Sequence, residues 1–245
     1  MSRPTNSYAL WITGLLIRAL FVLLIIGICA LTAWRVFFSR SIPEELRALS
    51  DNEILSAAYA ANGGELHILE QAQVPYSQAE DKQAYFNLDY CYFITEAKQL
   101  QLLFFYNNST LEYAAEDLEL AHVPPAGEEV FRLAVTQYIN TTPDKTGEER
   151  VIDSVTLTPS DCEIATTSLY TFFRYTFEGV DLTDNVVVYL DVFYGESEES
   201  YSTLRLSHEE SVSEVRTLTK AEKRSLRSKL CTITVRQEKT AMRSS

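Results

Sequence analysis

The feature that most constrains this chain is a long apolar run close to its N-terminus. Between Tyr8 and Trp34 the only charged residue is Arg18. A helix over Trp11–Trp34 would be about 35 Å long at about 1.5 Å per residue, which is enough to cross a hydrocarbon core of about 30 Å. The sequence therefore predicts a single transmembrane helix over residues 9–38.

Four residues are expected to lie at the two membrane interfaces. Trp11 and Trp34 stand at the ends of the apolar run, and tryptophan prefers the level of the lipid headgroups. Arg18 and Arg35 bracket its most apolar part, close enough to the ends for their guanidinium groups to reach water. The lipid bilayer is therefore the first predicted partner.

A cleaved signal peptide is the alternative interpretation of the same run. A signal core is usually shorter, and a small-x-small cleavage site normally follows it. Residues 35–40 read Arg-Val-Phe-Phe-Ser-Arg and contain no such site, which favours a retained anchor. Basic residues nearly balance on the two flanks, and the N-terminal segment 1–8 is too short to be a domain. We therefore expect a signal-anchor in the cell membrane, with the N-terminus inside and the C-terminal domain outside.

Charge is distributed very unevenly along the chain. The net charge of -13 combines +3 over residues 1–47, -22 over residues 48–213 and +6 over residues 214–245. A strongly acidic domain repels phosphate backbones, so nucleic acid is not an expected partner. The basic ends, in contrast, favour contact with anionic lipid headgroups.

Alternation of apolar and polar residues predicts a mainly β domain over residues 64–212. Phe86 to Ile94 shows the pattern clearly, with every second residue apolar, as in a strand that has one buried face. The predicted strands, most of them separated by turn residues, are 66–73, 86–95, 100–106, 130–138, 150–158, 164–177, 186–194 and 202–206. This series predicts an antiparallel β-sandwich, for which an immunoglobulin-like architecture is one option and a partly closed barrel the alternative.

Helices are predicted before this domain and once within it. Residues 41–45, Ser-Ile-Pro-Glu-Glu, are a typical helix start, and the Asn-Gly-Gly sequence at 62–64 is a typical stop. They predict a stalk helix over 41–62, with a break expected at 50–52. Residues 111–120 also have helical spacing.

The C-terminal segment, residues 213–245, is predicted to contain a basic helix and a disordered tail. Thr219 and Glu222 have the spacing of a capping box, and a run rich in Lys and Arg follows them. Disorder is expected after Leu230.

Histidine and cysteine, two of the residue types used most in metal sites, are sparse in this chain. The three histidines, His67, His122 and His208, have no His or Cys neighbour at ligand spacing, so neither a metal nor another cofactor is expected. The sequence contains no nucleophile elbow, no phosphate-binding glycine loop and no recognisable active-site cysteine. No catalytic residue is predicted.

Cys91 and Cys162 lie in predicted strands or at their edges. They can form a disulfide if the domain lies outside the cytoplasm. Two buried free thiols are the alternative, because a disulfide requires a specific and close geometry.

Two short motifs resemble uncharacterised single-pass membrane-anchored proteins of Gram-positive bacteria. They are Gln99-Leu100-Gln101-Leu102 and Tyr106-Asn107-Asn108-Ser109-Thr110-Leu111, which together cover ten of the 245 residues. The resemblance implies a cell-envelope location and brings no functional residue with it.

The sequence therefore predicts a membrane-anchored extracytoplasmic β-sandwich that acts as a binding or scaffolding module, with an envelope protein as its partner. Two alternatives remain open. One is a cytoplasm-facing, membrane-bound sensor or assembly factor, since the basic tail suits an anionic inner surface. The other is a hydrolase that uses two of the many carboxylates.

Overall fold

The structure, a computed structural model, describes residues 6–39, 41–72, 86–141, 150–181, 183, 186–206 and 214–243. The chain separates into two compact units, Met1–Ser41 and Ile42–Ser245. Helix α1 (Asn6–Ser39) belongs to the first unit and contains the whole predicted span. The expected apolar N-terminal helix is therefore confirmed. Of the predicted N-terminal segment, residues 1–5 lie outside the described residues.

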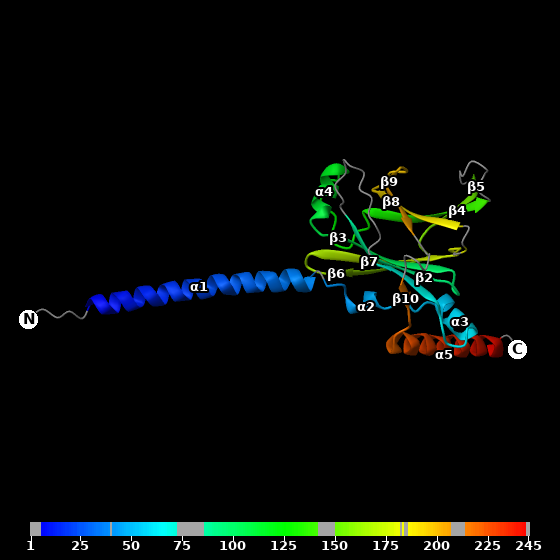
Figure 1. The fold of residues 1–245 in the computed structure, drawn as a ribbon, viewed down its shortest axis with the longest axis horizontal. Coiled ribbons are helices and arrows are strands. Elements are labelled where there is room, and N and C mark those ends of the chain that lie inside the picture. Colours follow the sequence, from blue (N-terminus) through cyan, green and yellow to red (C-terminus); the bar gives the residue numbers. More distant parts are fainter. Residues whose placement is uncertain are drawn as a thin grey trace, which may run out of the picture. The chain divides into compact units, whose positions relative to one another are not determined.

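Ten strands within the described residues of the second unit form two antiparallel sheets (Figure 1). In chain order they are β1 (Ile68–Ala72), β2 (Asn87–Ile94), β3 (Gln99–Asn107), β4 (Phe131–Thr141), β5 (Arg150–Leu157), β6 (Asp161–Thr166), β7 (Tyr170–Glu178), β8 (Val186–Tyr194), β9 (Ser200–Leu206) and β10 (Glu214–Arg216). Sheet A has the order β10-β1-β2-β3-β7-β6, and sheet B has the order β5-β4-β8-β9. The mainly β, sandwich-like prediction is thus confirmed, whereas the strand orders do not confirm the immunoglobulin-like architecture.

The main core lies between the two sheets. Buried apolar side chains from both inner faces pack there together with residues of α4 (Thr110–Asp117), the helix expected near residues 111–120. Phe104 of sheet A lies with its ring centroid 5.5 Å from that of Phe131 in sheet B and 6.2 Å from that of Phe173. Such aromatic pairs contribute about 0.5–1.5 kcal/mol each beyond the area they bury. The pair of Phe104 with Phe131 therefore stabilises the contact between the sheets, whereas Phe173 lies beside Phe104 within sheet A.

Helices cover the other face of sheet A (Figure 1). They are α2 (Glu44–Arg47), α3 (Glu53–Ala61) and α5 (Lys220–Arg243). A second cluster of buried apolar residues fills this interface, including Leu46, Leu55, Leu226, Tyr92 and Leu103. Sheet A is therefore buried on both faces, and this explains why its central strands are apolar almost throughout.

Strand β2 departs from the simple alternation expected for it. Its register shifts between Leu88 and Cys91, so that Phe86 and Cys91 both belong to the inner core although they stand five positions apart. Tyr90 and Tyr92 face the helical layer instead. The prediction of one buried and one wetter face is therefore wrong for this strand. The bulge turns the residues that follow it toward the opposite faces of the sheet, and both faces are covered there.

The predicted stalk helix over residues 41–62 is two short helices packed on sheet A. Residues 48–52 between them are not helical, which confirms the expected break, and Asn52 caps α3 by accepting the Leu55 N–H at 2.8 Å. Leu46 and Leu55 are buried under this layer. A stalk is therefore the wrong description. Burying these apolar side chains against the sheet is more favourable in free energy than leaving them exposed to solvent.

Two further boundaries differ from the sequence-based expectation. The single strand predicted over 164–177 is two strands, β6 and β7, joined by a turn in which the Thr167 N–H donates to the Tyr170 carbonyl at 2.8 Å. The C-terminal segment contributes β10 to sheet A, and α5 continues to Arg243 where disorder was expected after Leu230. The sequence after Thr219 contains no Gly or Pro, the residues that most strongly disfavour a helix, so nothing of this kind ends α5 after Leu230.

Candidate functional site

Helix α1 presents an apolar surface to its surroundings. Every residue from Trp11 to Trp34 is exposed, and the two tryptophans are 66% and 64% accessible. This stretch of 24 residues is long and apolar enough to cross a membrane, a property that anchors share with signal sequences. Arg18 lies within it. Arg35 follows on the same helix, and its side chain is outside the described residues.

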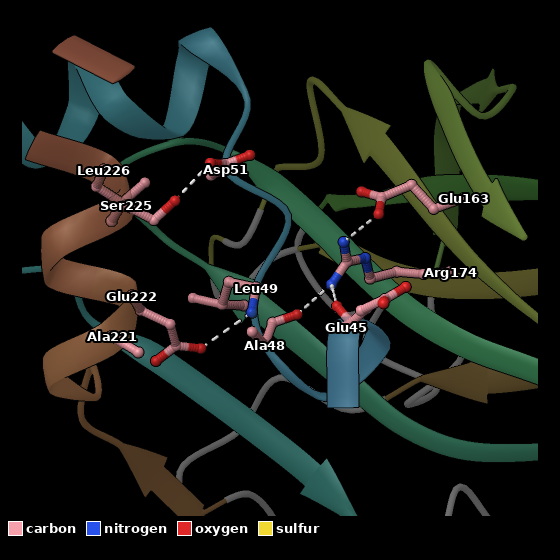
Figure 2. Close-up of a pocket in the computed structure, with 10 residues that line it drawn as sticks. All are labelled: Glu45, Ala48, Leu49, Asp51, Glu163, Arg174, Ala221, Glu222, Ser225 and Leu226. Atoms are coloured by element: carbon pink, nitrogen blue, oxygen red, sulfur yellow. Dashed lines mark hydrogen bonds and ion pairs between the residues drawn. The ribbon is translucent and has the colours of Figure 1, made fainter. Parts of the chain in front are cut away.

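The segment that follows α1, residues 42–52, is called here the entry segment, and Arg174 of β7 holds it to sheet A (Figure 2). The Arg174 side chain is only 5% exposed. One of its terminal nitrogens donates to the Glu45 carbonyl at 3.0 Å and to the Ala48 carbonyl. The other lies 2.5 Å from a carboxylate oxygen of Glu163 on β6. Arg174 thus joins the entry segment to two strands.

Other polar groups of sheet A complete this attachment. The Ser50 N–H donates to the Gln101 side-chain oxygen at 2.9 Å, and the Ser50 hydroxyl donates to Glu163 at 2.9 Å. The Tyr90 hydroxyl donates to the Leu46 carbonyl. These groups are buried or partly buried. Removing one member of a hydrogen-bonded pair therefore leaves the other without a hydrogen-bond partner, which lowers the stability of the fold by about 1–3 kcal/mol.

Helix α5 holds the entry segment from the other side through Glu222. This buried carboxylate accepts the Leu49 N–H at 2.9 Å and a guanidinium nitrogen of Arg216 at 2.6 Å. It also accepts the Thr219 N–H at 2.8 Å, and Thr219 in turn caps the helix, so the predicted capping box is confirmed. Burial acts to raise the pKa of Glu222, but the hydrogen bonds from Arg216, Leu49 and Thr219 outweigh it and hold the pKa below the ordinary 4.5.

A second contact with α5 involves Asp51. The Ser225 hydroxyl donates to its carboxylate at 2.5 Å, and the Lys229 ammonium lies 3.4 Å from the other oxygen. Partial burial acts to raise the pKa of Asp51, but Ser225 and Lys229 outweigh it and lower the pKa below its ordinary 3.8. Residues near the two ends of the second unit are therefore bound directly to each other.

These contacts surround a polar pocket of about 250 Å³ (Figure 2). Its lining comes from the entry segment, sheet A and α5: Glu45, Ala48, Leu49, Asp51, Glu163, Arg174, Ala221, Glu222, Ser225 and Leu226. Of its four carboxylates, Asp51, Glu163 and Glu222 already bind a cationic or hydroxyl partner. We therefore interpret the pocket as the junction that fixes the entry segment, and we do not place the chemistry of the alternative hydrolase hypothesis in it.

The outer face of sheet B, called here the open face, is different in character. No helix of the described part of the chain covers it (Figure 1). It carries aromatic, hydroxyl and charged side chains at positions set by the strand registers. Tyr138, Tyr189, Asp191 and Phe193 are half-buried, Arg132 and Thr203 are exposed, and Thr136 is buried. A surface that combines partly exposed rings with hydrogen-bonding groups is suited to contact with another molecule.

Side chains on the open face are held in place by contacts across the strands. The Tyr138 and Tyr189 rings meet edge to face with centroids 5.4 Å apart, and the Arg132 guanidinium lies 5.7 Å from the Phe193 ring centroid. Asp191 accepts hydrogen bonds from the hydroxyls of two threonines, one on each neighbouring strand, both at 2.7 Å. The face therefore offers an ordered rather than a flexible surface.

A cleft of about 560 Å³ adjoins the open face and shares Arg132 and Phe193 with it. Strands and loops at the ends of both sheets line the cleft, and Cys162 and Tyr175 are part of this lining. The Tyr175 hydroxyl donates to Glu129 at 2.6 Å. The cleft extends the candidate binding surface from the flat sheet into a concave region.

The fold keeps the two cysteines of the proposed disulfide apart. Cys91 on β2 and Cys162 on β6 are free thiols, and strands β3 and β7 lie between their strands in sheet A. Three strand spacings of about 4.8 Å exceed the Cα separation of about 7 Å beyond which a disulfide cannot close. Burial, to which the nearby Glu129 charge adds at Cys162, raises the pKa of both thiols to about 12, so neither is an activated nucleophile.

Among the residues that the structure describes, no three His, Cys, Asp or Glu side chains gather in a way that could hold a metal ion. No family model, curated protein or solved structure matches the chain. The candidate sites therefore rest on their own geometry.

Sequence reasoning missed the residues that build the polar junction, Arg174, Gln101 and Glu163 above all. A signal for two of them was present, because Arg174 and Gln101 each stand inside a strand that is otherwise largely apolar. A charged or amide side chain at such a position is seldom buried without a specific partner. The partner itself, the entry segment more than 50 positions away, could not be identified from that pattern.

Proposed function

We propose that this chain is a single-pass membrane protein whose helix α1 is retained as an anchor, with the N-terminus inside and the β-sandwich outside, where it acts as a binding module for an envelope protein. The anchor is supported by the continuity of α1, which runs unbroken from Asn6 to Ser39. That length is well beyond a signal-peptide core of about 7–15 residues. The second unit begins at Ile42, directly after this helix.

The observation that carries the binding role is the unequal covering of the two sheets. Sheet A is buried on both faces, whereas the open face of sheet B keeps Tyr138, Tyr189 and Phe193 only half-buried beside Arg132. Tyrosine, phenylalanine and arginine are the side chains that protein interfaces use most for binding energy. We assign the partner contact to the open face and the adjoining cleft.

Site-directed photo-crosslinking in intact cells tests this role. A photo-reactive phenylalanine derivative would replace Tyr189 on the open face of the full-length chain. The matched control places the same group at Tyr113 on α4, a tyrosine that is 52% exposed on another side of the domain. We expect a discrete adduct of higher mass from position 189 and none of that mass from position 113.

Two results would contradict the proposal. One is the absence of any adduct at position 189 while the protein is present in the membrane at its normal level. The other is an identical set of adducts from both positions, which would indicate random collision rather than a binding surface. A specific adduct from position 113 alone would move the partner contact to the α4 side of the sandwich.

A further inference from the structure

Helix α5 differs in charge from the rest of the second unit. Between Lys220 and Arg243 it carries eight basic and two acidic residues, whereas residues 48–213 have a net charge of -22. One of the two acids, Glu222, is buried and paired with Arg216. The helix is therefore a basic element on an acidic domain.

Over residues 220–230, whose side chains the structure describes, α5 packs through one side. Leu226 and Glu222 are buried against the layer above sheet A, and Ser225 and Lys229 bind Asp51. Leu226 lies four residues after Glu222 and Lys229 four residues after Ser225, so these positions form a single stripe along the helix. The stripe faces the entry segment and α3.

The opposite side of α5 carries Lys220, Arg224 and Arg227, which is called here the basic face. Their spacing of four and then three residues places them together, roughly half a turn away from Glu222 and Leu226. All three side chains are exposed, and within the described residues none of them forms an ion pair with a carboxylate. This face is therefore charged and, in the part of the chain that the structure describes, without an ion-pair partner.

The chain also keeps α5 within reach of a membrane. α5 binds Leu49 and Asp51, and Asp51 comes only 12 residues after Ser39, the last residue of α1. Twelve residues span at most about 43 Å even when fully extended. If α1 crosses a bilayer, the basic face is thus permanently tethered near its surface, at a very high effective concentration.

We propose that the basic face of α5 binds the anionic lipid headgroups of the same membrane that α1 crosses. Charge decides the choice of partner, because the surrounding acidic domain is repelled by such a surface while the basic face is attracted to it. The helix would therefore set which side of the domain turns toward the bilayer. This inference rests on the proposed anchoring by α1.

Quenching between a labelled α5 and labelled lipid headgroups tests this contact in the full-length chain. The chain, with its four native cysteines replaced and Ser228→Cys carrying a fluorophore, would be reconstituted in nanodiscs. Ser228 is exposed on α5 and lies outside the packed stripe. The discs contain either phosphatidylcholine alone or phosphatidylcholine with phosphatidylglycerol, each with a trace of lipid whose headgroup bears a nitroxide quencher.

We expect strong quenching in the anionic discs and little in the neutral ones, with the difference reduced at high salt because screening weakens surface attraction. The double variant R224Q/R227Q should shift the ratio of docked to undocked α5 about thirtyfold toward the undocked state, at about fivefold per basic residue. The control K98Q/R205Q removes the same charge from two exposed residues elsewhere and should leave the ratio nearly unchanged.

Equal quenching in neutral and anionic discs would overturn the inference, because lipid charge would then have no effect. An equal loss of quenching in both double variants would also overturn it, because the basic face would then have no special role. Insertion is assessed separately by resistance of the chain to alkaline extraction from the bilayer. A chain that inserts but shows no charge-dependent quenching refutes the lipid contact and leaves the anchor intact. A chain that is extracted refutes the proposed anchor and the inference with it.

Discussion

The buried carboxylate of Glu222 accepts the backbone N–H of Leu49 at 2.9 Å, although the two residues stand 173 positions apart. This bond joins α5 to the entry segment, and Arg216 neutralises the same carboxylate from β10. Residues close to the two ends of the second unit therefore depend on each other. The domain cannot lose either α5 or the entry segment without exposing the helical face of sheet A.

Replacing Glu222 is expected to destabilise the domain strongly. Glu222→Ala leaves the Leu49 N–H and the Arg216 guanidinium without their acceptor, and breaking a buried charge pair in this way costs about 3–5 kcal/mol. Urea unfolding of the full-length chain in mild detergent, followed by circular dichroism, measures the free energy. The control Glu116→Ala removes an exposed carboxylate from α4 and should change it by less than about 0.5 kcal/mol. Equal effects of the two substitutions would refute the role of Glu222.

Arg174 and Glu163 are expected to contribute unequally although they form one ion pair. The Arg174 side chain is 5% exposed and binds two backbone carbonyls besides Glu163, which is itself 41% exposed. Arg174→Gln should therefore cost about 3 kcal/mol and Glu163→Gln about 1 kcal/mol. In a double-mutant cycle, the variant with both changes should be close to Arg174→Gln alone. A larger loss from Glu163→Gln than from Arg174→Gln would contradict this assignment.

Acid should weaken the junction through Glu222. Because the folded pKa of Glu222 lies below the ordinary 4.5, the carboxylate stabilises the fold above pH 4.5, and this contribution is lost as the pH falls through the folded pKa. The difference in unfolding free energy between the wild type and Glu222→Gln should be constant from pH 7 to about 4.5 and shrink below it. If this difference in unfolding free energy grew on acidification, it would contradict the lowered pKa of Glu222.

Cys91 and Cys162 are expected to be recovered as unlinked thiols. Their strands are separated by two others in sheet A, and burial raises the pKa of both thiols to about 12. Alkylation of the unfolded chain without reductant, followed by peptide mass analysis, should find both cysteines modified. The native chain at neutral pH should react slowly at Cys91, which is fully buried. A peptide pair joined through these two residues would contradict the strand order of sheet A.

Sequence patterns predicted the local elements well because those depend on nearby residues. The apolar run to Trp34 predicted α1, and alternation predicted most strands of both sheets. The capping box of Thr219 and Glu222 was also visible, since it requires a spacing of only three residues. These features need no knowledge of the fold.

Features that depend on distant partners could not be predicted in this way. The bulge after Leu88 decides which face Tyr90 and Tyr92 present, yet it leaves no mark in the alternation itself. Glu222 was recognised as a helix cap, whereas its bond to Leu49 follows only from the packing of α5 on the entry segment. The candidate binding surface has the same origin, because the sequence does not show which sheet the helices cover.

Membrane topology is the most direct test of the proposed anchored, outward-facing domain. Single cysteines at Ser7→Cys and Ser200→Cys, in a background without the native thiols, would be labelled in intact cells with a membrane-impermeant maleimide. Ser200 is exposed at the start of β9. Labelling at position 200 and not at position 7 is the expected result and places the open face outside the cell. Labelling at position 7 and not at position 200 would contradict it and place the sandwich in the cytoplasm.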